Sequence, residues 1–233
     1  MSPARRPQRG RSVVPVLLGL ILLLGGGGGG GCGGATSDAP KLHGYVRTPS
    51  LDVGGVTLPD VRPGGSERSP MRASPDGLLL VYFGYTSCPD VCPTTLSDIE
   101  VALGELRAAA RERVRVAMVT IDPARDLGEV LTHYVQTFVP GAHALRTEDA
   151  ALLARVADRF GASYSVERGE SGAIEVSHTA FVYAVDDAGL LRLQWPFGTT
   201  PVAFARDVRA LLDGFDPGGS RAADPDSNDQ EVS

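Results

Sequence analysis

The sequence predicts an α/β sandwich with one antiparallel edge, because strand-like and helix-like apolar patterns alternate through its middle part. Residues 78–83 (LLLVYF) form a continuous apolar run, which is typical of a strand buried on both faces of a sheet. Residues 94–113 follow with apolar side chains at helical spacing. Farther on, two apolar runs flank the turn sequence Asp-Asp-Ala-Gly at 186–189, which indicates a hairpin.

The remaining predicted elements continue this alternation. The third helix is expected where a threonine and two acids precede an amphipathic run, since such residues cap and stabilise a helix start. The last helix is expected after Thr200-Pro201, because proline is favoured in the first turn. In chain order these elements are a strand at 114–121, helices at 127–138 and 147–160, hairpin strands at 178–185 and 190–194, and a helix from 200 to about 214.

Composition excludes several classes of protein. With 42% hydrophobic and 21% charged residues, the chain has the make-up of a globular protein with a buried core. Its net charge of −6 argues against nucleic-acid binding through a basic surface. Three cysteines exclude a four-thiolate zinc or iron–sulfur site and a disulfide-dense scaffold.

The N-terminal residues 1–31 have the pattern of an export signal. Four arginines precede an apolar run at 13–24, and a run of glycines leads to Cys32. The apolar run is shorter than the roughly 20 residues needed to span a bilayer. Cys32 fits a bacterial lipoprotein cleavage site, so we expect it to be lipidated. The alternatives are an uncleaved anchor helix and ordinary cleavage, and each of the three places the domain outside the cytoplasm.

The rest of the chain divides into a tether, a domain and a tail. Residues 32–50 are expected to be a flexible tether, 51–215 the folded domain and 216–233 a disordered acidic tail. Within the domain, residues 62–77 are polar and rich in Gly, Pro and Ser, which predicts a surface insertion. Residues 166–177 (VERGESGAIEVS) are expected to form a loop. A monomer is the default expectation for such a domain.

The chemistry is expected at the turn between the first strand and the first helix, where Cys88 and Cys92 stand four residues apart. Unpaired backbone N–H groups and the helix dipole stabilise thiolates at such a position. Two thiolates with one imidazole suit Cu(I). The structural alternative is a plain disulfide, which would add little stability across so short a loop.

The residues around these cysteines resemble the SCO (SenC) family. The segment FGYTSCPDVCPTTL looks like that family's signature, and the stretch from Asp122 to Asp126 (DPARD) is similar to its DPxRD motif. Ser177-His178-Thr179 resembles the segment that carries the family's third copper ligand. The resemblance covers roughly residues 51–214, with all three motifs in the family's order.

This resemblance implies a thioredoxin-like three-layer sandwich with a mixed central sheet. It implies that Cys88, Cys92 and His178 bind a copper ion, Cu(I) or Cu(II), and that Asp122 and Asp126 support the site from behind. It also implies a metallochaperone that is held at the outer face of the membrane and helps assemble the Cu(A) centre of cytochrome c oxidase.

A thiol–disulfide oxidoreductase that reduces client disulfides with Cys88 and Cys92 is the alternative function. In that case His178 would tune a thiolate or supply a proton. Asp122 and Asp126 have their own alternative, as caps of the helix that follows them. The other histidines, His43, His133 and His143, are not expected to be ligands.

Overall fold

The computed structural model describes residues 40–169 and 172–217. The predicted export signal, Cys32 and nearly all of the predicted acidic tail lie outside these residues. Within the described ranges, no helix has the length and apolar character needed to cross a membrane.

A six-stranded mixed sheet forms the centre of the domain, in the order β1-β10-β9-β4-β5-β6. β4, β5 and β6 run parallel, whereas β9, β10 and β1 pair antiparallel. The sheet strands are β1 (Leu51–Asp52), β4 (Leu78–Gly84), β5 (Val114–Thr120), β6 (His143–Leu145), β9 (Phe181–Val185) and β10 (Leu190–Pro196).

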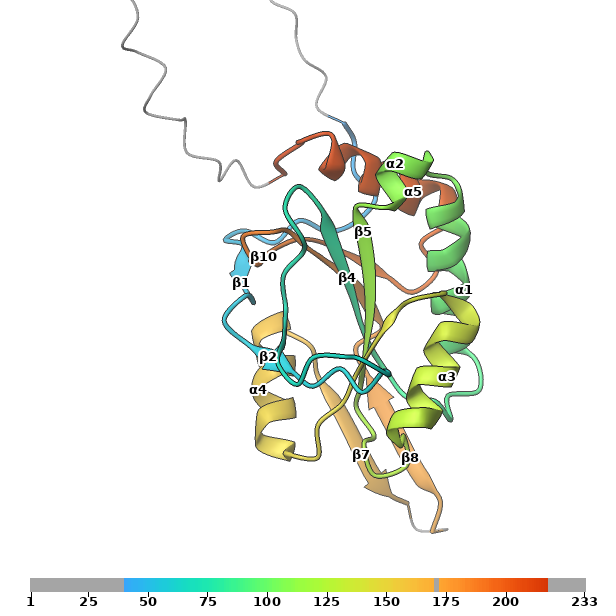
Figure 1. Ribbon diagram of the computed structural model, residues 1–233. Coiled ribbons are helices and arrows are strands. Elements are labelled where there is room, and N and C mark those ends of the chain that lie inside the picture. Colours follow the sequence, from blue (N-terminus) through green and yellow to red (C-terminus); the bar gives the residue numbers. More distant parts are fainter. Residues whose placement is uncertain (1–39, 170–171, 218–233) are drawn as a thin grey trace, which may run out of the picture. The chain divides into compact units, whose positions relative to one another are not determined.

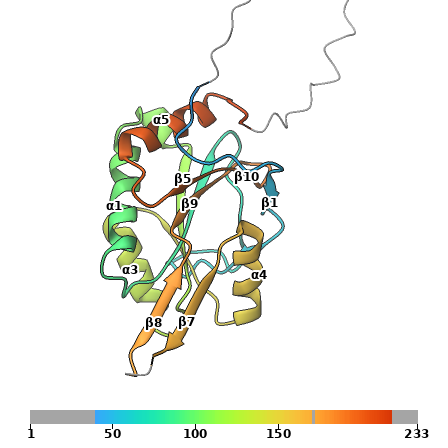
Figure 2. The same cartoon turned by 180° about the vertical axis from the view of Figure 1, so that it is seen from behind.

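Helices cover both faces of this sheet, because residues along each strand point alternately to its two sides. Along β4, Leu80 and Tyr82 belong to one buried cluster, whereas Val81 and Phe83 belong to the other. Figures 1 and 2 show one face covered by α1 and α3 and the other by α4. The helices are α1 (Val91–Gly104), α2 (Ala108–Arg111), α3 (Gly128–Phe138), α4 (Ala150–Phe160) and α5 (Pro201–Leu212). The predicted three-layer sandwich with a mixed sheet is confirmed.

The first helix differs from its predicted bounds of 94–113. It begins at Val91, since Pro93 falls in the first turn, where its missing N–H costs no hydrogen bond. It ends at Gly104, a poor helix former, and Arg107 then adopts an extended conformation before the short α2. This earlier start places Cys92 inside the first helical turn.

The predicted strand 178–185 is in fact two strands. β8 (Ile174–His178) pairs with β7 (Tyr164–Arg168) in a separate hairpin, and the central sheet resumes only at β9. The break falls at Thr179, whose N–H donates to the Ser163 carbonyl, 2.8 Å away. His178 therefore ends a hairpin strand instead of beginning a core strand, and the segment 166–177, read as a loop from sequence, is largely this hairpin.

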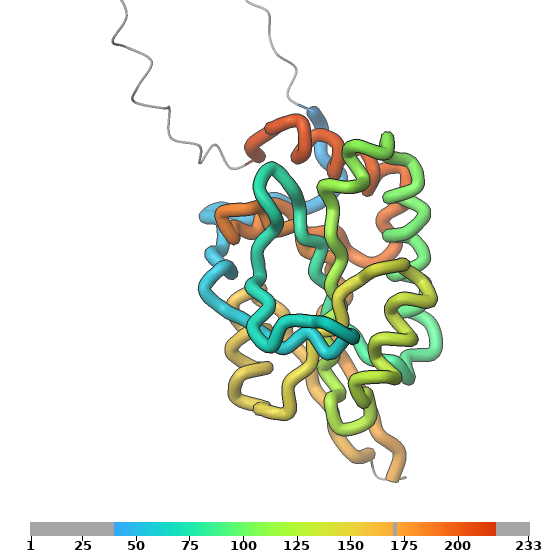
Figure 3. Tube along the Cα trace, viewed as in Figure 1, coloured from blue at the N-terminus to red at the C-terminus, as the bar shows by residue number. Residues whose placement is uncertain are grey.

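The predicted surface insertion at 62–77 is partly a core segment. Met71 is fully buried, and Ala73 is nearly so. Strands β2 (Thr57–Leu58) and β3 (Ser69–Pro70) pair with each other, and the N–H of Val61 donates to the carbonyl of Ala144 in β6. Figure 3 shows this cyan and teal segment looping over one side of the sheet. The insertion is polar where it is exposed and contributes Met71 to the core.

The predicted tether of residues 32–50 overlaps the folded domain. The fully buried carboxylate of Asp207 on α5 accepts hydrogen bonds from the backbone N–H groups of His43 and Gly44, both at 2.8 Å. It also accepts from Nε1 of the buried Trp195, at 2.9 Å. Tyr45 then exchanges backbone hydrogen bonds with Gln194 of β10. The ordered domain thus begins several residues before Leu51.

Asp207→Ala is expected to lower the free energy of unfolding by about 3 kcal/mol, because it leaves the buried Nε1–H of Trp195 and two partly buried backbone N–H groups without an acceptor. Urea unfolding of the full-length chain measures this. Asp158→Ala, which removes an exposed acid on α4, is the control and is expected to change stability by less than about 0.5 kcal/mol. Equal unfolding midpoints for the two variants would contradict the anchoring role of Asp207.

Candidate metal centre

The two cysteines lie where β4 ends and α1 begins. The side chains of Tyr82 and Cys92 lie close to the backbone of Gly84, the last residue of β4. A Cβ on Gly84 would lie 2.7 Å from the Tyr82 ring and 3.1 Å from Sγ of Cys92. A larger residue at position 84 would push the Cys92 sulfur or the tyrosine aside. Cys88 precedes the helix, Cys92 lies in its first turn, and both are free thiols in this structure.

Cys88 is the half-exposed member of the pair. Its Sγ accepts a hydrogen bond from the backbone N–H of Cys92, at 3.3 Å, and so satisfies one of the free donors at the helix start. Burial by itself raises the pKa of the Cys88 thiol, but hydrogen bonds from the backbone of Asp90 and Cys92 outweigh it and lower the pKa below its usual value. Cys88 is therefore the thiol more readily ionised.

Cys92 is fully buried in the cluster beneath α1. Burial raises the pKa of its thiol to about 12, even though the hydroxyl of Tyr82 donates to its sulfur from 3.4 Å. The two thiols thus differ strongly in acidity, and Cys92 loses its proton far less readily than Cys88.

His178 reaches this pair from the β7–β8 hairpin. Its Nε2 lies 3.8 Å from Sγ of Cys92, and its Nδ1 lies 3.3 Å from the carbonyl oxygen of Thr179. Donation from Nδ1 to that carbonyl leaves the lone pair of Nε2 directed at the sulfur. The rings of Tyr82 and Tyr85 stand edge-on against the imidazole. Burial lowers the pKa of His178 against the opposing effect of the Thr179 carbonyl, which favours the neutral, ligand-competent ring.

The spacing of these groups fits a shared metal ion. A metal ion about 2.3 Å from a sulfur and about 2.0 Å from an imidazole nitrogen, with about 120° between the bonds, separates the two ligand atoms by about 3.7 Å. The observed distance from Sγ of Cys92 to Nε2 of His178 is 3.8 Å. Cys92 contacts both Cys88 and His178. As they stand, the described residues contain no group of three His, Cys, Asp or Glu side chains close enough to hold a metal ion. Three-fold coordination therefore requires Cys88 and His178 to approach each other.

Asp126 supports the cysteine loop from behind. Its carboxylate is fully buried and accepts hydrogen bonds from the backbone N–H of Thr86, at 3.1 Å, and from the hydroxyls of Thr86 and Thr120, at 2.5 and 2.6 Å. Thr86 stands two residues before Cys88, and Thr120 ends β5. The carboxylate thus joins the cysteine loop to the neighbouring strand.

Asp122 is buried beside this network but is paired differently. Its carboxylate accepts from Nε of Arg125, and its backbone N–H donates to the Thr120 hydroxyl, at 3.0 Å. Neither Asp122 nor Asp126 makes a side-chain cap for α3, so the cap alternative is wrong. Asp122 holds the turn after β5, whereas Asp126 contacts the cysteine loop directly.

Several contributors to the site were missed from sequence. Thr86 and Thr120 hold Asp126, and the Tyr82 hydroxyl reaches Cys92; the only sequence signal was the place of these residues near the ends of two adjacent parallel strands. Of the remaining histidines, His43 pairs with Asp207 and His143 with Asp60, both far from the cysteines in the fold.

Comparison with known proteins gives a consistent result. The SCO1/SenC family model matches residues 71–213. A protein of Stutzerimonas stutzeri described as a putative copper-binding protein is 34% identical over 113 residues, which cover 48% of this chain and 55% of that protein. The match thus spans only about half the length of the curated relatives.

Solved structures match over a larger share of the chain. The solution structure of apo Sco1 from Thermus thermophilus has a TM-score of 0.64 and 32% identity, covering 73% of this chain and 97% of that one. Copper-bound ScoI of Bradyrhizobium japonicum has a TM-score of 0.57 and 28% identity, covering 67% and 98%.

In the reduced protein at pH 7.5, iodoacetamide is expected to alkylate Cys88 at least tenfold faster than Cys92. This pH lies about one unit below the usual thiol pKa, so the thiol with the lower pKa is ionised to the greater extent. The reasons are its exposure and its lowered pKa. Time-resolved peptide mapping by mass spectrometry measures each cysteine separately and distinguishes both from Cys32. Faster labelling of Cys92 would show that the two thiols are assigned the wrong way round.

Asp126→Asn is expected to lower the free energy of unfolding by about 2 kcal/mol, because an amide offers one acceptor oxygen to a site built from three donors. Asp122→Asn is the matched comparison, with an expected loss below about 1 kcal/mol, since it weakens an ion pair to a partly exposed arginine. Thermal unfolding of both variants measures the difference, and a larger loss at Asp122 would contradict this account.

Proposed function

Because this chain belongs to the SCO1/SenC family, we propose that it binds one copper ion through Cys88, Cys92 and His178 and passes it to another protein. The observation that carries the proposal is the position of His178, whose Nε2 is directed at the Cys92 sulfur from a separate hairpin.

The donor set favours Cu(I) over the other common metal ions. Thiolates and imidazole are soft or borderline ligands, whereas magnesium and calcium require oxygen ligands. Structural zinc takes four protein ligands, and this site supplies three. Cys88 is readily deprotonated and His178 is neutral, so only Cys92 must release a proton as the metal binds.

The difference in exposure between Cys88 and Cys92 supports release of the metal. Cys88 is the ligand that solvent and a partner can reach, so ligand exchange with a client thiolate begins there, while Cys92 and His178 hold the ion. By family, the proposed recipient is the subunit of cytochrome c oxidase that carries the Cu(A) centre. The proposed location is outside the cytoplasm, at the membrane surface, with anchoring by a lipidated Cys32 or by the N-terminal segment. Asp122 and Asp126 act as positioning residues.

A second candidate function is reduction of a client disulfide, and the unequal acidity of the two thiols favours it. The Cys88 thiolate would attack one sulfur of the client, breaking the client S–S bond and forming a mixed disulfide. Cys92 would then lose its proton and attack Cys88, releasing the client as a dithiol and leaving a Cys88–Cys92 disulfide. Two electrons pass from the protein to the client.

An anaerobic Cu(I) competition titration of the reduced full-length chain tests the copper proposal. The expected result is one tightly bound Cu(I) per chain, loss of tight binding in Cys88→Ser, and binding weakened by about tenfold or more in His178→Ala, equivalent to about 1.4 kcal/mol. His133→Ala, which removes an exposed histidine on α3, is the matched control and is expected to bind like the wild type.

Weak binding that is equal in the wild type, His178→Ala and His133→Ala would contradict the copper proposal. The reduction potential of the Cys88–Cys92 pair and single-turnover reduction of a model disulfide would then test the second candidate.

A further inference from the structure

A cavity of about 330 Å³ lies over one face of the sheet, lined by side chains of β4, β5 and β6 and of the loop above them. The apolar lining residues Leu79, Ala117 and Leu145 belong to the buried cluster on that face, whereas Cys92 belongs to the cluster on the other face. The cavity is therefore distinct from the candidate metal centre.

The sheet register brings basic side chains to this cavity. Arg115 pairs with Leu79 of β4, and Ala117 pairs with His143 of β6. Since residues two apart on a strand share a face, Arg115, Ala117 and His143 project to the same side of the sheet. The loop over that side adds Arg62 and Arg72 to the lining.

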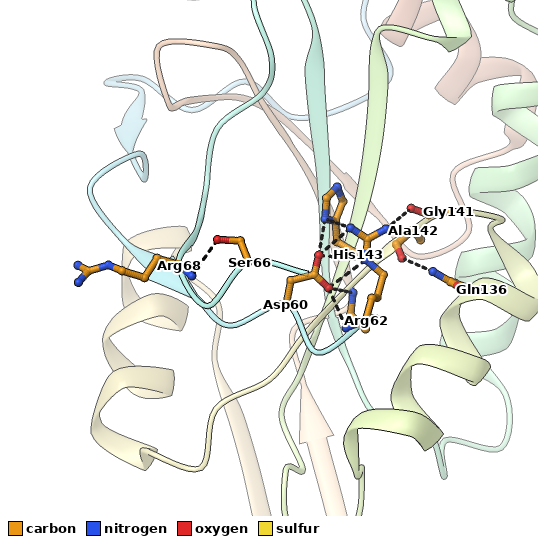
Figure 4. Close-up of polar contacts among 9 residues, drawn as sticks. Asp60, Arg62, Ser66, Arg68, Gln136, Gly141, Ala142 and His143 are labelled. Atoms are coloured by element: carbon orange, nitrogen blue, oxygen red, sulfur yellow. Dashed lines mark hydrogen bonds and ion pairs between the residues drawn. The ribbon is translucent and has the colours of Figure 1, made fainter. Parts of the chain in front are cut away.

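Arg62 and His143 are fixed in place by one acid, as Figure 4 shows. The buried carboxylate of Asp60 accepts from Nε and Nη2 of Arg62, with the shortest contact at 2.7 Å, and lies 2.8 Å from Nδ1 of His143. Nη1 of Arg62 donates to the Gly141 carbonyl, at 2.8 Å. Asp60 thus neutralises one arginine. Nη2 of Arg62 also lies 2.7 Å from Nδ1 of His143, so Asp60 and Arg62 together hold the imidazole, whose Nε2 has no hydrogen-bond partner among the described residues.

The other two arginines bring uncompensated charge. Within the described part of the chain, neither Arg72 nor Arg115 forms an ion pair or a side-chain hydrogen bond, and no Asp or Glu lines the cavity. Arg115 comes from β5 and Arg72 from the loop above it, so two exposed guanidinium groups border the cavity from different elements. Cationic side chains that border one cavity without a paired acid favour binding of an anion.

The remaining lining indicates the kind of anion. The hydroxyls of Ser69 and Ser74 offer further hydrogen-bond donors, while Leu79, Ala117 and Leu145 form an apolar floor. The volume lies in the range of small-molecule sites, in which a few polar groups orient a partly apolar ligand.

We propose that this cavity binds a small soluble organic anion, with its phosphate or carboxylate group between Arg72 and Arg115 and a compact apolar body against the floor. Arginine suits such a group because its guanidinium offers paired donors to two oxygens. The ligand takes no part in copper binding, since the cavity and Cys92 lie on opposite faces of the sheet.

Calorimetric titration of the full-length chain in a neutral detergent, with phenyl phosphate as the probe, tests this proposal. The expected result is saturable binding of one phenyl phosphate per chain, weakened at least tenfold in Arg115→Gln and in Arg72→Gln. Arg206→Gln, which removes an exposed arginine on α5, is the matched control with an expected change below twofold. Inorganic phosphate should bind at least threefold more weakly than phenyl phosphate, because it cannot use the apolar floor.

Absence of saturable binding would overturn the proposal, as would equal weakening in Arg115→Gln and Arg206→Gln, which indicates only diffuse charge attraction. A chain truncated after residue 217 provides a further comparison. If truncation tightens phenyl phosphate binding more than tenfold, the acidic tail is the occupant of the cavity and the proposal of a separate ligand is wrong. Circular dichroism of each variant confirms that the fold is retained.

Discussion

The buried carboxylate of Asp126 is the interaction on which the arrangement of the candidate site depends. It holds the backbone and hydroxyl of Thr86 on one side and the hydroxyl of Thr120 on the other, so the ends of β4 and β5 and the cysteine loop form one unit. Burying a carboxylate is favourable only where its oxygens are fully hydrogen-bonded. The loop that carries Cys88 therefore has one supported position, and the start of α1 is fixed relative to the sheet.

His178, the third proposed ligand, is held by different contacts from those that hold the cysteine loop. His178 ends a two-stranded hairpin that pairs with no strand of the central sheet, and its imidazole is held by the Thr179 carbonyl and by the rings of Tyr82 and Tyr85. Two ligands thus come from a rigid junction of strand and helix, while the third comes from a small element with few long-range hydrogen bonds. Such a division suits the proposed function of holding and releasing an ion, because a small two-stranded hairpin opens more readily than a junction of strand and helix within the core.

Strong local patterns made most of the fold predictable. The apolar runs at 78–83 and 114–121 and the capped helices at 147–160 and 200–214 correspond to β4, β5, α4 and α5 within a few residues.

Predictions failed where a distant partner decides the structure. The hairpin β7–β8 pairs only with itself and carries exposed polar residues, so its pattern resembled a loop. His43 and Gly44 are ordered only because Asp207 accepts their N–H groups from 163 or more residues away. At the site, the cysteines and His178 were predicted from motifs that resemble the SCO (SenC) family, whereas the supporting Thr86 and Thr120 act through a contact that sequence does not reveal.

Extended X-ray absorption at the copper edge of the Cu(I)-loaded protein tests the central claim most directly, because it reports the atoms bound to the metal. The account predicts two sulfur neighbours at about 2.2–2.3 Å and one nitrogen at about 2.0 Å, with the nitrogen lost in His178→Ala and retained in His133→Ala. A first shell with no sulfur, or one unchanged by His178→Ala, would contradict coordination by Cys88, Cys92 and His178.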